Sequence, residues 1–175
     1  HLSLRRQRQM CIRDRLLAYD LGTKQWGAVR YPLEAPAQEG AWVGLSELTI
    51  HDGHAYLIER DNLIGDKAAL KSLTRVSLAD MQPAALGSDL PVVRKELVRD
   101  FIPDLKSQTN GYVVDKVEGF AIDAEGYGFV VTDNDGVDDS SGETLFFEIG
   151  RMDEQSAPLS AQSVSYTHLT LPTKA

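Results

Sequence analysis

The sequence predicts an all-β chain of antiparallel sheets, and two observations support this. Short apolar stretches separated by Gly, Pro, Asn and Asp turns fill residues 16–162, and no long amphipathic helix interrupts them. The pattern also restarts, since an apolar strand, a Gly turn, a second strand and an Asp/Asn cluster surround both Ile50–Gly53 and Ile122–Gly126. Repeated four-stranded units are typical of β-propeller blades, so we predict a partial, incomplete propeller.

The strands are expected in three groups. The first is a hairpin, Leu17–Asp20 and Trp26–Tyr31, joined by a turn that contains Gly22. The second is a blade of four strands, in which Asp52-Gly53 is a strong hairpin turn; its strands are Gly44–Ile50, Ala55–Arg60, Leu73–Leu78 and Val92–Arg99. The third group begins the next blade with strands Val117–Ile122, Gly128–Thr132 and Thr144–Ile149.

The spacing of the two restarts is longer than that of common propeller repeats. Ile50 and Ile122 lie 72 residues apart, against about 40–50 residues per blade. Two long loops, 62–70 and 102–113, account for the difference. A β-sandwich made of the same strands is the alternative fold.

Both ends of the chain are predicted to be foreign to the domain. Residues Arg5–Arg15 and Val164–Thr173 back-translate to the two strands of a transposon-based sequencing adapter. We therefore assign 1–15 and 163–175 to translated adapter and 16–162 to a partial domain. The alternative for the first run is a basic arm that binds nucleic acid or membrane. The excluded part holds Cys11, the only cysteine, so the domain offers no thiol chemistry.

The charge balance excludes one class of partner. The chain has 18 basic and 26 acidic side chains. Without the five arginines and one aspartate of the N-terminal run, 18 − 5 = 13 basic and 26 − 1 = 25 acidic residues give a net charge of −12. This balance argues against nucleic acid as a partner, because that binding depends on Lys and Arg. No apolar run approaches the roughly 18 residues that suggest a membrane span.

Hairpin topology predicts where the polar side chains gather. In each hairpin the start of the first strand lies beside the end of the second, so Glu47 should lie near the end of the next strand, and Glu118 near Asp133. Equivalent positions of successive blades share one face, so both groups should meet at the mouth of the propeller. The predicted members are Glu47, Glu59, Arg60, Asp61, Asn62, Glu118, Asp133, Asn134 and Asp135.

Such a ring of carboxylates and amides suits a hard cation. Ca²⁺ takes 6–8 oxygen ligands, and the run Asp133–Asp139 resembles part of a calcium loop, although its Gly comes early and no Glu stands at the twelfth position. The predicted metal ligands are Asp61, Asn62, Asp133, Asn134, Asp135 and Asp138. The alternative is a turn-forming surface loop whose side chains cap the local backbone.

Arg60 is the one cation predicted within this group. A guanidinium matches phosphate in a bidentate way, so Arg60 can hold an anionic substrate; its alternative role is an ion pair with Glu59 or Asp61. His51 and His54 flank the Asp52-Gly53 turn and are expected to be exposed turn residues. The Gly-x-Ser-x-Gly motif of serine hydrolases is absent from the sequence.

Several motifs, in this order, resemble one family. They are Trp42–Thr49, Ile58–Asn62, Lys95–Asp100, Lys116–Gly119 and Val131–Glu143. Together they are similar to the phytase-like domain of exported bacterial proteins, the "esterase-like activity of phytase" family. The resemblance implies a propeller, a periplasmic or secreted location, and phosphoesterase or esterase activity.

The resulting hypothesis is a metal-assisted hydrolase of small, anionic phosphoric esters. Glu47, Glu59, Arg60 and Glu118 are the predicted catalytic residues, and bound Ca²⁺ would activate water and neutralise substrate charge. Two alternatives remain open on the same scaffold. One is a non-catalytic propeller that binds a ligand or a protein, for which aromatic side chains at the mouth would be expected. The other is a lactonase-like or carboxylic ester hydrolase.

Overall fold

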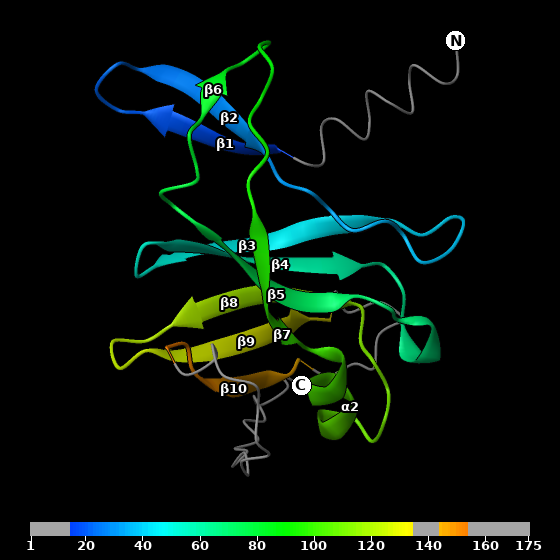
Figure 1. Ribbon diagram of the computed structural model, residues 1–175. Helices are drawn as coiled ribbons and strands as arrows, with labels where there is room; N and C mark the ends of the chain where they lie inside the picture. Colours follow the sequence, from blue (N-terminus) through cyan, green and yellow to red (C-terminus); the bar gives the residue numbers. More distant parts are fainter. Residues whose placement is uncertain (1–14, 135–143, 154–175) are drawn as a thin grey trace, which may run out of the picture.

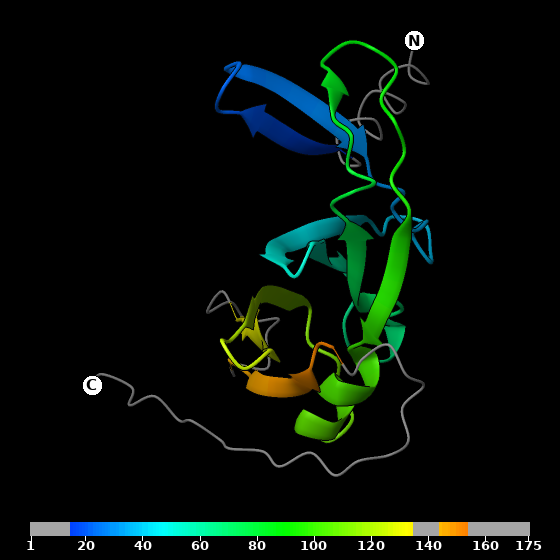
Figure 2. The same cartoon turned by 60° about the vertical axis from the view of Figure 1, so that its left-hand side comes forward.

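The computed structural model describes residues 15–134 and 144–153 of the chain, and these form three antiparallel sheets stacked one on another (Figures 1 and 2). The predicted all-β class with antiparallel pairing is therefore confirmed. In this described part of the chain, no helix is long and apolar enough to cross a membrane.

Sheet A contains the predicted N-terminal hairpin. Strand β1 (Arg15–Asp20) pairs with β2 (Gln25–Arg30), and the short β6 (Ala84–Ala85) adds to the other edge of β2. The Asp20 carboxylate accepts a hydrogen bond from the Thr23 amide at 2.6 Å and so closes the turn. Strand β1 begins at Arg15, which pairs with Arg30.

Sheet B is the predicted four-stranded unit and lies in the middle of the stack. Its order is β3 (Val43–His51), β4 (His54–Asp61), β5 (Lys71–Ser77) and β7 (Lys95–Asp100). Asp52 and Gly53 both have positive φ, 42° and 71°, as a tight hairpin turn with matching strand twist requires. The loop from β4 to β5 contains a 3₁₀ turn, Gly65–Lys67.

Sheet C repeats the first three strands of sheet B, as predicted. Its order is β8 (Lys116–Ile122), β9 (Tyr127–Asp133) and β10 (Phe146–Arg151). The β8–β9 turn has Gly126 at φ 87°, a conformation that favours glycine. A bulge at Glu118 interrupts the pairing of these two strands.

The segment before β7 differs from the prediction. Strand β7 begins at Lys95, and Val92 instead forms a parallel bridge with Arg30 of sheet A. The segment between β5 and β7 thus crosses to the neighbouring sheet, where β6 pairs with Gly27 and Ala28. The physical reason is that the outer edge of β2 carries backbone groups that need partners, and this segment supplies them.

A second difference is the short helix α2 (Ile102–Gln108), where a loop was predicted. Proline is favoured in the first helical turn, where Pro103 lies. Leu105 is buried and anchors the helix to the core. Arg99 donates two hydrogen bonds of 2.7 Å to Asp104, which tie the helix to β7. Ile102 also packs against the core but is only partly buried, and one buried residue in seven is too little periodicity to recognise from sequence.

The sheets are held together by two hydrophobic cores. One core lies between sheets A and B and includes Leu16, Val29, Ala55, Leu57 and Val76. The other lies between sheets B and C and includes Tyr56, Ile58, Phe120, Val130 and Phe147. Sheet B therefore buries both of its faces, whereas each sheet of a two-layer sandwich buries one.

Gly119 is expected to be intolerant of even a methyl group. It lies beside the bulge at Glu118, and a Cβ built there would come within 2.4 Å of Cγ1 of Val131, a branched side chain with little freedom to move. Gly119→Ala should lower the free energy of unfolding by about 1–3 kcal/mol, as overpacking does. Urea unfolding is the measurement. Ala121→Val adds carbon at an exposed position of the same strand and should change stability by less than about 0.5 kcal/mol; equal effects of both variants would contradict the close contact.

Candidate functional site

Strand β4 ends in three consecutive charged residues that are all buried. Glu59, Arg60 and Asp61 retain 0, 6 and 1% of their exposure. They are buried because β4 is a central strand of the sheet that is covered on both faces. Buried charges are costly unless they are paired and hydrogen-bonded. Their partners therefore show how this end of the sheet is organised.

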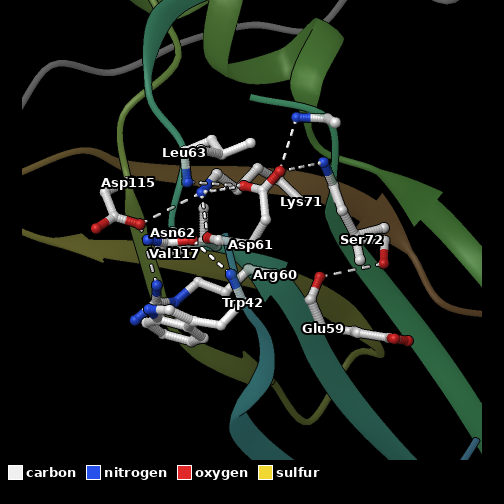
Figure 3. A network of polar contacts seen from close by, with 12 residues as sticks. Trp42, Glu59, Arg60, Asp61, Asn62, Leu63, Lys71, Ser72, Asp115 and Val117 are labelled. Atoms are coloured by element: carbon white, nitrogen blue, oxygen red, sulfur yellow. Dashed lines mark hydrogen bonds and ion pairs between the residues drawn. The ribbon is translucent and has the colours of Figure 1, made fainter. Parts of the chain in front are cut away.

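Arg60 and Lys71 form the centre of a polar cluster between sheets B and C. Nη1 of Arg60 contacts Oδ1 of Asp115 at 3.0 Å, and Nη2 donates to the Glu118 carboxylate. Nζ of Lys71 lies 3.0 Å from Oδ1 of Asp61 and 3.4 Å from Oδ1 of Asp115. We call these residues the Arg60–Lys71 cluster: Arg60, Asp61, Lys71, Asp115 and Glu118. Figure 3 labels the first four of them.

The cluster has a buried cationic base and a carboxylate rim. The side chains of Arg60 and Lys71 are 7% and 0% exposed, whereas those of Asp115 and Glu118 are 31% and 35% exposed. Trp42 covers another side, with its ring centroid 5.3 Å from the Arg60 guanidinium, within the range of a cation–π contact. Burial lowers the pKa of Lys71, and Asp61 and Asp115 oppose this shift by favouring the charged form.

Contacts between β3 and β8 bring together two strands that lie far apart in the sequence. The Ser46 hydroxyl donates to the Val117 carbonyl at 2.7 Å, and the Thr49 hydroxyl donates to the Phe120 carbonyl at 2.8 Å. These bonds place the start of β8 beside the end of β4. The predicted meeting of Arg60 with Glu118 is therefore observed.

Asp61 and Asn62 hold the chain as it leaves β4. The Asp61 carboxylate accepts hydrogen bonds from the amides of Leu63, Ala69 and Leu70, at 2.8–3.2 Å, and Lys71 Nζ also donates to the Asp61 carbonyl at 2.7 Å. The Asn62 side-chain oxygen accepts from the Trp42 amide. Both residues thus lie at the predicted end of the sheet, and their role as metal ligands stays a prediction.

Glu59 points to the opposite face of sheet B, away from Arg60 (Figure 3). Its carboxylate accepts hydrogen bonds from the Tyr31 hydroxyl at 2.9 Å, Lys95 Nζ at 2.8 Å and the Glu34 amide at 2.6 Å. Tyr31 directly follows β2, so its bond connects sheet B to sheet A, whereas Lys95 belongs to β7 of sheet B itself. Glu59 is therefore separated from the cluster that it was predicted to join, because successive side chains of a strand alternate between faces.

The other predicted residues lie nearby or outside the described chain. Glu47 follows a bulge in β3, and its carboxylate accepts a hydrogen bond from the Leu48 amide. Asp133 ends β9 and pairs in register with Lys116, two residues before Glu118, and Asn134 follows it. Asp135 and Asp138 lie outside the described residues. Within residues 15–134 and 144–153, no group of three or more His, Cys, Asp or Glu side chains is arranged to hold a metal ion.

Three residues of the site were missed by sequence reasoning. Lys71 faces Arg60 in the β4–β5 register, so a hairpin register drawn from the sequence would have found it. Asp115 comes just before β8, at the acidic start of the repeat, and was passed over in favour of Glu118. Trp42 comes just before β3. Apart from its place in the motif Trp42–Thr49, nothing in the sequence indicates that it lies at the site.

Tyr31 gives the A–B contact a pH dependence. Burial, with Glu59 beside it, raises the pKa of its phenol. Above about pH 10 the unfolded chain releases this proton and the folded chain keeps it, so the free energy of unfolding should fall by about 1.4 kcal/mol per pH unit. The lowered pKa of Lys71 makes the free energy of unfolding rise with pH. This rise is confined to pH values below about 10.4, the pKa of a lysine in the unfolded chain.

Urea unfolding between about pH 10.5 and 11.5 isolates the Tyr31 contribution. Tyr31→Phe should remove this decline, while Tyr19→Phe, at an exposed position, should retain it. The same slope in both variants would show that Tyr31 is not the group responsible.

A family model described as "Phytase-like: Esterase-like activity of phytase" matches residues 6–136. The match covers every residue of the Arg60–Lys71 cluster, and it begins inside the segment assigned to adapter sequence. That assignment stays a prediction. Neither a curated protein nor a solved structure matches the chain.

Proposed function

The chain belongs to the phytase-like family, "esterase-like activity of phytase", and from this premise we propose that it is part of a hydrolase acting on phosphoric esters. The proposed site is the Arg60–Lys71 cluster. Propellers host binding modules as well as hydrolases, so the case for the activity has to come from the residues of the site.

One observation supports the proposal most directly: two carboxylates that are about one third exposed stand above two buried cations. Phosphoryl transfer depends on stabilising negative charge on the transferred group, which Arg60 and Lys71 supply in a poorly solvated setting. Asp115 and Glu118 are the cluster's carboxylates that solvent reaches, and either can position water or take a proton from it. Opening their ion pairs with Arg60 would free the guanidinium to bind a phosphate in a bidentate way.

The proposed Ca²⁺ site lies at the end of β9. Asp133 and Asn134 offer oxygen ligands at the same end of sheet C as Glu118, and the predicted set continues with Asp135 and Asp138. A bound Ca²⁺ would neutralise substrate charge and activate water. Asp61 is less suited as a ligand, because three amides and Lys71 already engage its carboxylate.

We also propose that the three sheets are successive blades of a propeller. The support is that sheet B buries both faces and that sheet C repeats its strand order. In this arrangement β3 and β8 are the inner strands, and the Arg60–Lys71 cluster lies at the mouth between two blades. An extracytoplasmic location, periplasmic or secreted, is proposed from the family alone.

Trp42 favours a second candidate function, that of a non-catalytic binding module. Trp42 is 38% exposed, and its ring stacks on Arg60. An aromatic surface next to charged groups is typical of ligand recognition. In this case anionic ligands would bind at the cluster without being turned over.

The experiment is an assay of the chain against phosphomonoesters, including phytate, and against carboxylic esters, with Ca²⁺ or with a chelator. Phosphoester hydrolysis should depend on Ca²⁺. Glu118→Gln and Asp115→Asn should each lower kcat/KM by about 10²-fold, as loss of acid–base catalysis does. Glu96→Gln makes the same chemical change in an ion pair of β7 with a half-exposed carboxylate and should leave activity unchanged.

Other outcomes separate the candidate functions. Calorimetric binding of phytate without turnover, lost in Glu118→Gln or Trp42→Ala, would replace the hydrolase with a binding module. Hydrolysis of carboxylic esters alone would indicate the lactonase-like alternative. Equal activity in Glu118→Gln and Glu96→Gln would place the site elsewhere.

A further inference from the structure

One N–H group of the Arg60 guanidinium has no hydrogen-bond partner. Arg60 is 6% exposed, and its Nε is a buried atom that donates to nothing within residues 15–134 and 144–153. The other two nitrogens are engaged, Nη1 by Asp115 and Nη2 by Glu118. A buried donor without a partner costs free energy. In a folded protein such an atom calls for an explanation, and a bound ligand is one of them.

The unpaired group shows which edge of the guanidinium is incompletely used. The N–H groups of arginine form a planar fork, in which Nε–H and one N–H of Nη2 point to the same side. Two oxygen atoms of one anion can therefore accept hydrogen bonds from this edge together. Glu118 accepts from Nη2 alone. Its carboxylate thus occupies the edge without satisfying both donors.

The two carboxylates that contact Arg60 are held unequally. Oδ1 of Asp115 contacts two cations, Nη1 of Arg60 at 3.0 Å and Nζ of Lys71 at 3.4 Å. Within the described residues, Glu118 contacts one cation, through Nη2 of Arg60, and its side chain is 35% exposed. Glu118 is therefore the carboxylate that an incoming anion displaces more easily.

The backbone on both sides of Glu118 is fixed, which confines any movement to its side chain. The Ser46 hydroxyl donates to the Val117 carbonyl at 2.7 Å. The Thr49 hydroxyl donates to the Phe120 carbonyl at 2.8 Å. Glu118 itself is the extra residue of the bulge in β8, and bulges commonly redirect a side chain next to a functional site. Its carboxylate can leave Arg60 by bond rotation while the contact between sheets B and C persists.

We propose that Glu118 is an internal competitor for the anion site: a phosphate group displaces its carboxylate and accepts hydrogen bonds from Nε and Nη2 of Arg60. Asp115 stays in place, because its departure would separate it from two cations rather than one. The phosphate satisfies the donor that is otherwise unpaired. Glu118 thus regulates the site by limiting how tightly phosphate is held there. This inference rests on the proposed function, since it takes Arg60 as the phosphate-binding group, but it does not require turnover.

The first test is calorimetric titration of the whole chain with inorganic phosphate at constant ionic strength. Glu118→Gln keeps the size of the side chain and removes its charge, so it should bind phosphate about tenfold more tightly than the unaltered chain. Asp115→Asn removes a charge from the same guanidinium but leaves Glu118 on the edge, and should change the affinity by less than about threefold. Glu96→Gln, in β7, should bind like the unaltered chain. Lys116 and Asp133, which pair at the start of β8, are the same in every variant.

The second test observes the Nε–H group of Arg60 directly, by NMR of isotope-labelled protein. Phosphate should shift this signal to higher proton frequency, because the group then donates to a charged oxygen. The same concentration of chloride should leave the signal in place. A general effect of removed charge on anion binding does not predict a change at this particular N–H group.

Each other result overturns the inference. Three results would show that Glu118 is not the competitor: no binding of phosphate, equal affinity in Glu118→Gln and the unaltered chain, or equal increases in Glu118→Gln and Asp115→Asn. An Nε–H signal that does not move at saturating phosphate would place the anion elsewhere. If circular dichroism shows that Glu118→Gln is unfolded, Glu118→Ala replaces it with the same expected increase. The expected phosphate binding without hydrolysis of any phosphoester would reject the catalytic proposal alone.

Discussion

Replacing Lys71 with methionine is expected to lower the free energy of unfolding by about 3–5 kcal/mol, the usual cost of removing one partner of a buried ion pair. Lys71 is fully buried, and its ammonium lies 3.0 Å from the Asp61 carboxylate, which is 1% exposed. Without Lys71, that carboxylate loses its nearest cation and has no access to water. Its hydrogen bonds from backbone amides offset only part of this loss. Urea unfolding monitored by circular dichroism measures the change.

A double-mutant cycle with Asp61→Asn tests the cause. If the ion pair carries the effect, the two substitutions should be non-additive, with a coupling of about 1–3 kcal/mol. Lys67→Met changes an exposed lysine of the loop that precedes β5 and should alter stability by less than about 0.5 kcal/mol. Simple additivity of the two cluster substitutions would show that Lys71 contributes through packing of its chain instead.

Glu59→Gln is expected to lower the free energy of unfolding by about 2–4 kcal/mol, because it converts charge-assisted hydrogen bonds into neutral ones and leaves Lys95 without its buried partner. The effect should be greatest where sheets A and B meet, since the Glu59 carboxylate binds Tyr31, the Glu34 amide and Lys95 there. Hydrogen exchange of the β2 amides should accelerate more than that of the β9 amides.

The matched control for this prediction is Glu96→Gln. Glu96 pairs with Arg75 at 3.1 Å, but its side chain is 50% exposed, so the pair should contribute less than about 1 kcal/mol. Equal losses in Glu59→Gln and Glu96→Gln would contradict the importance of burial. Uniform acceleration of exchange across all sheets would show that Glu59 stabilises the whole stack rather than the A–B contact.

The sequence predicted the sheets well because their signals are local. The Asp52-Gly53 turn and the alternating strands around it define a hairpin without tertiary information. Helix α2 and strand β6 were missed for the opposite reason. Leu105 is the helix's only buried residue, and the alanines of β6 pair with β2 only because an unpaired edge lies across the stack.

For the site, topology was a better guide than residue type. The rule that hairpin ends share an edge placed Arg60 and Glu118 together, and they form an ion pair. It is wrong, however, to assign every acidic residue near that edge to the site. Glu59 adjoins Arg60 in sequence, and strand alternation alone indicates that the two side chains face different neighbours. The pattern of carboxylates does not by itself point to Lys71, the cation that must compensate them when they are buried.

The crossing of residues 84–93 from sheet B to sheet A has a consequence for the order of folding. Sheet A cannot gain its third strand until the chain has passed through β3, β4 and β5, because Ala84 and Ala85 pair with residues of β2. Pairings between distant segments form slowly, since the intervening loop must be closed first. During synthesis, the outer edge of β2 in the β1–β2 hairpin therefore stays unpaired while strands β3, β4 and β5 of sheet B are made. Strand β2 thus keeps an unpaired edge for as long as residues 31–83 take to be synthesised, and an open edge of this kind is exposed to misassembly.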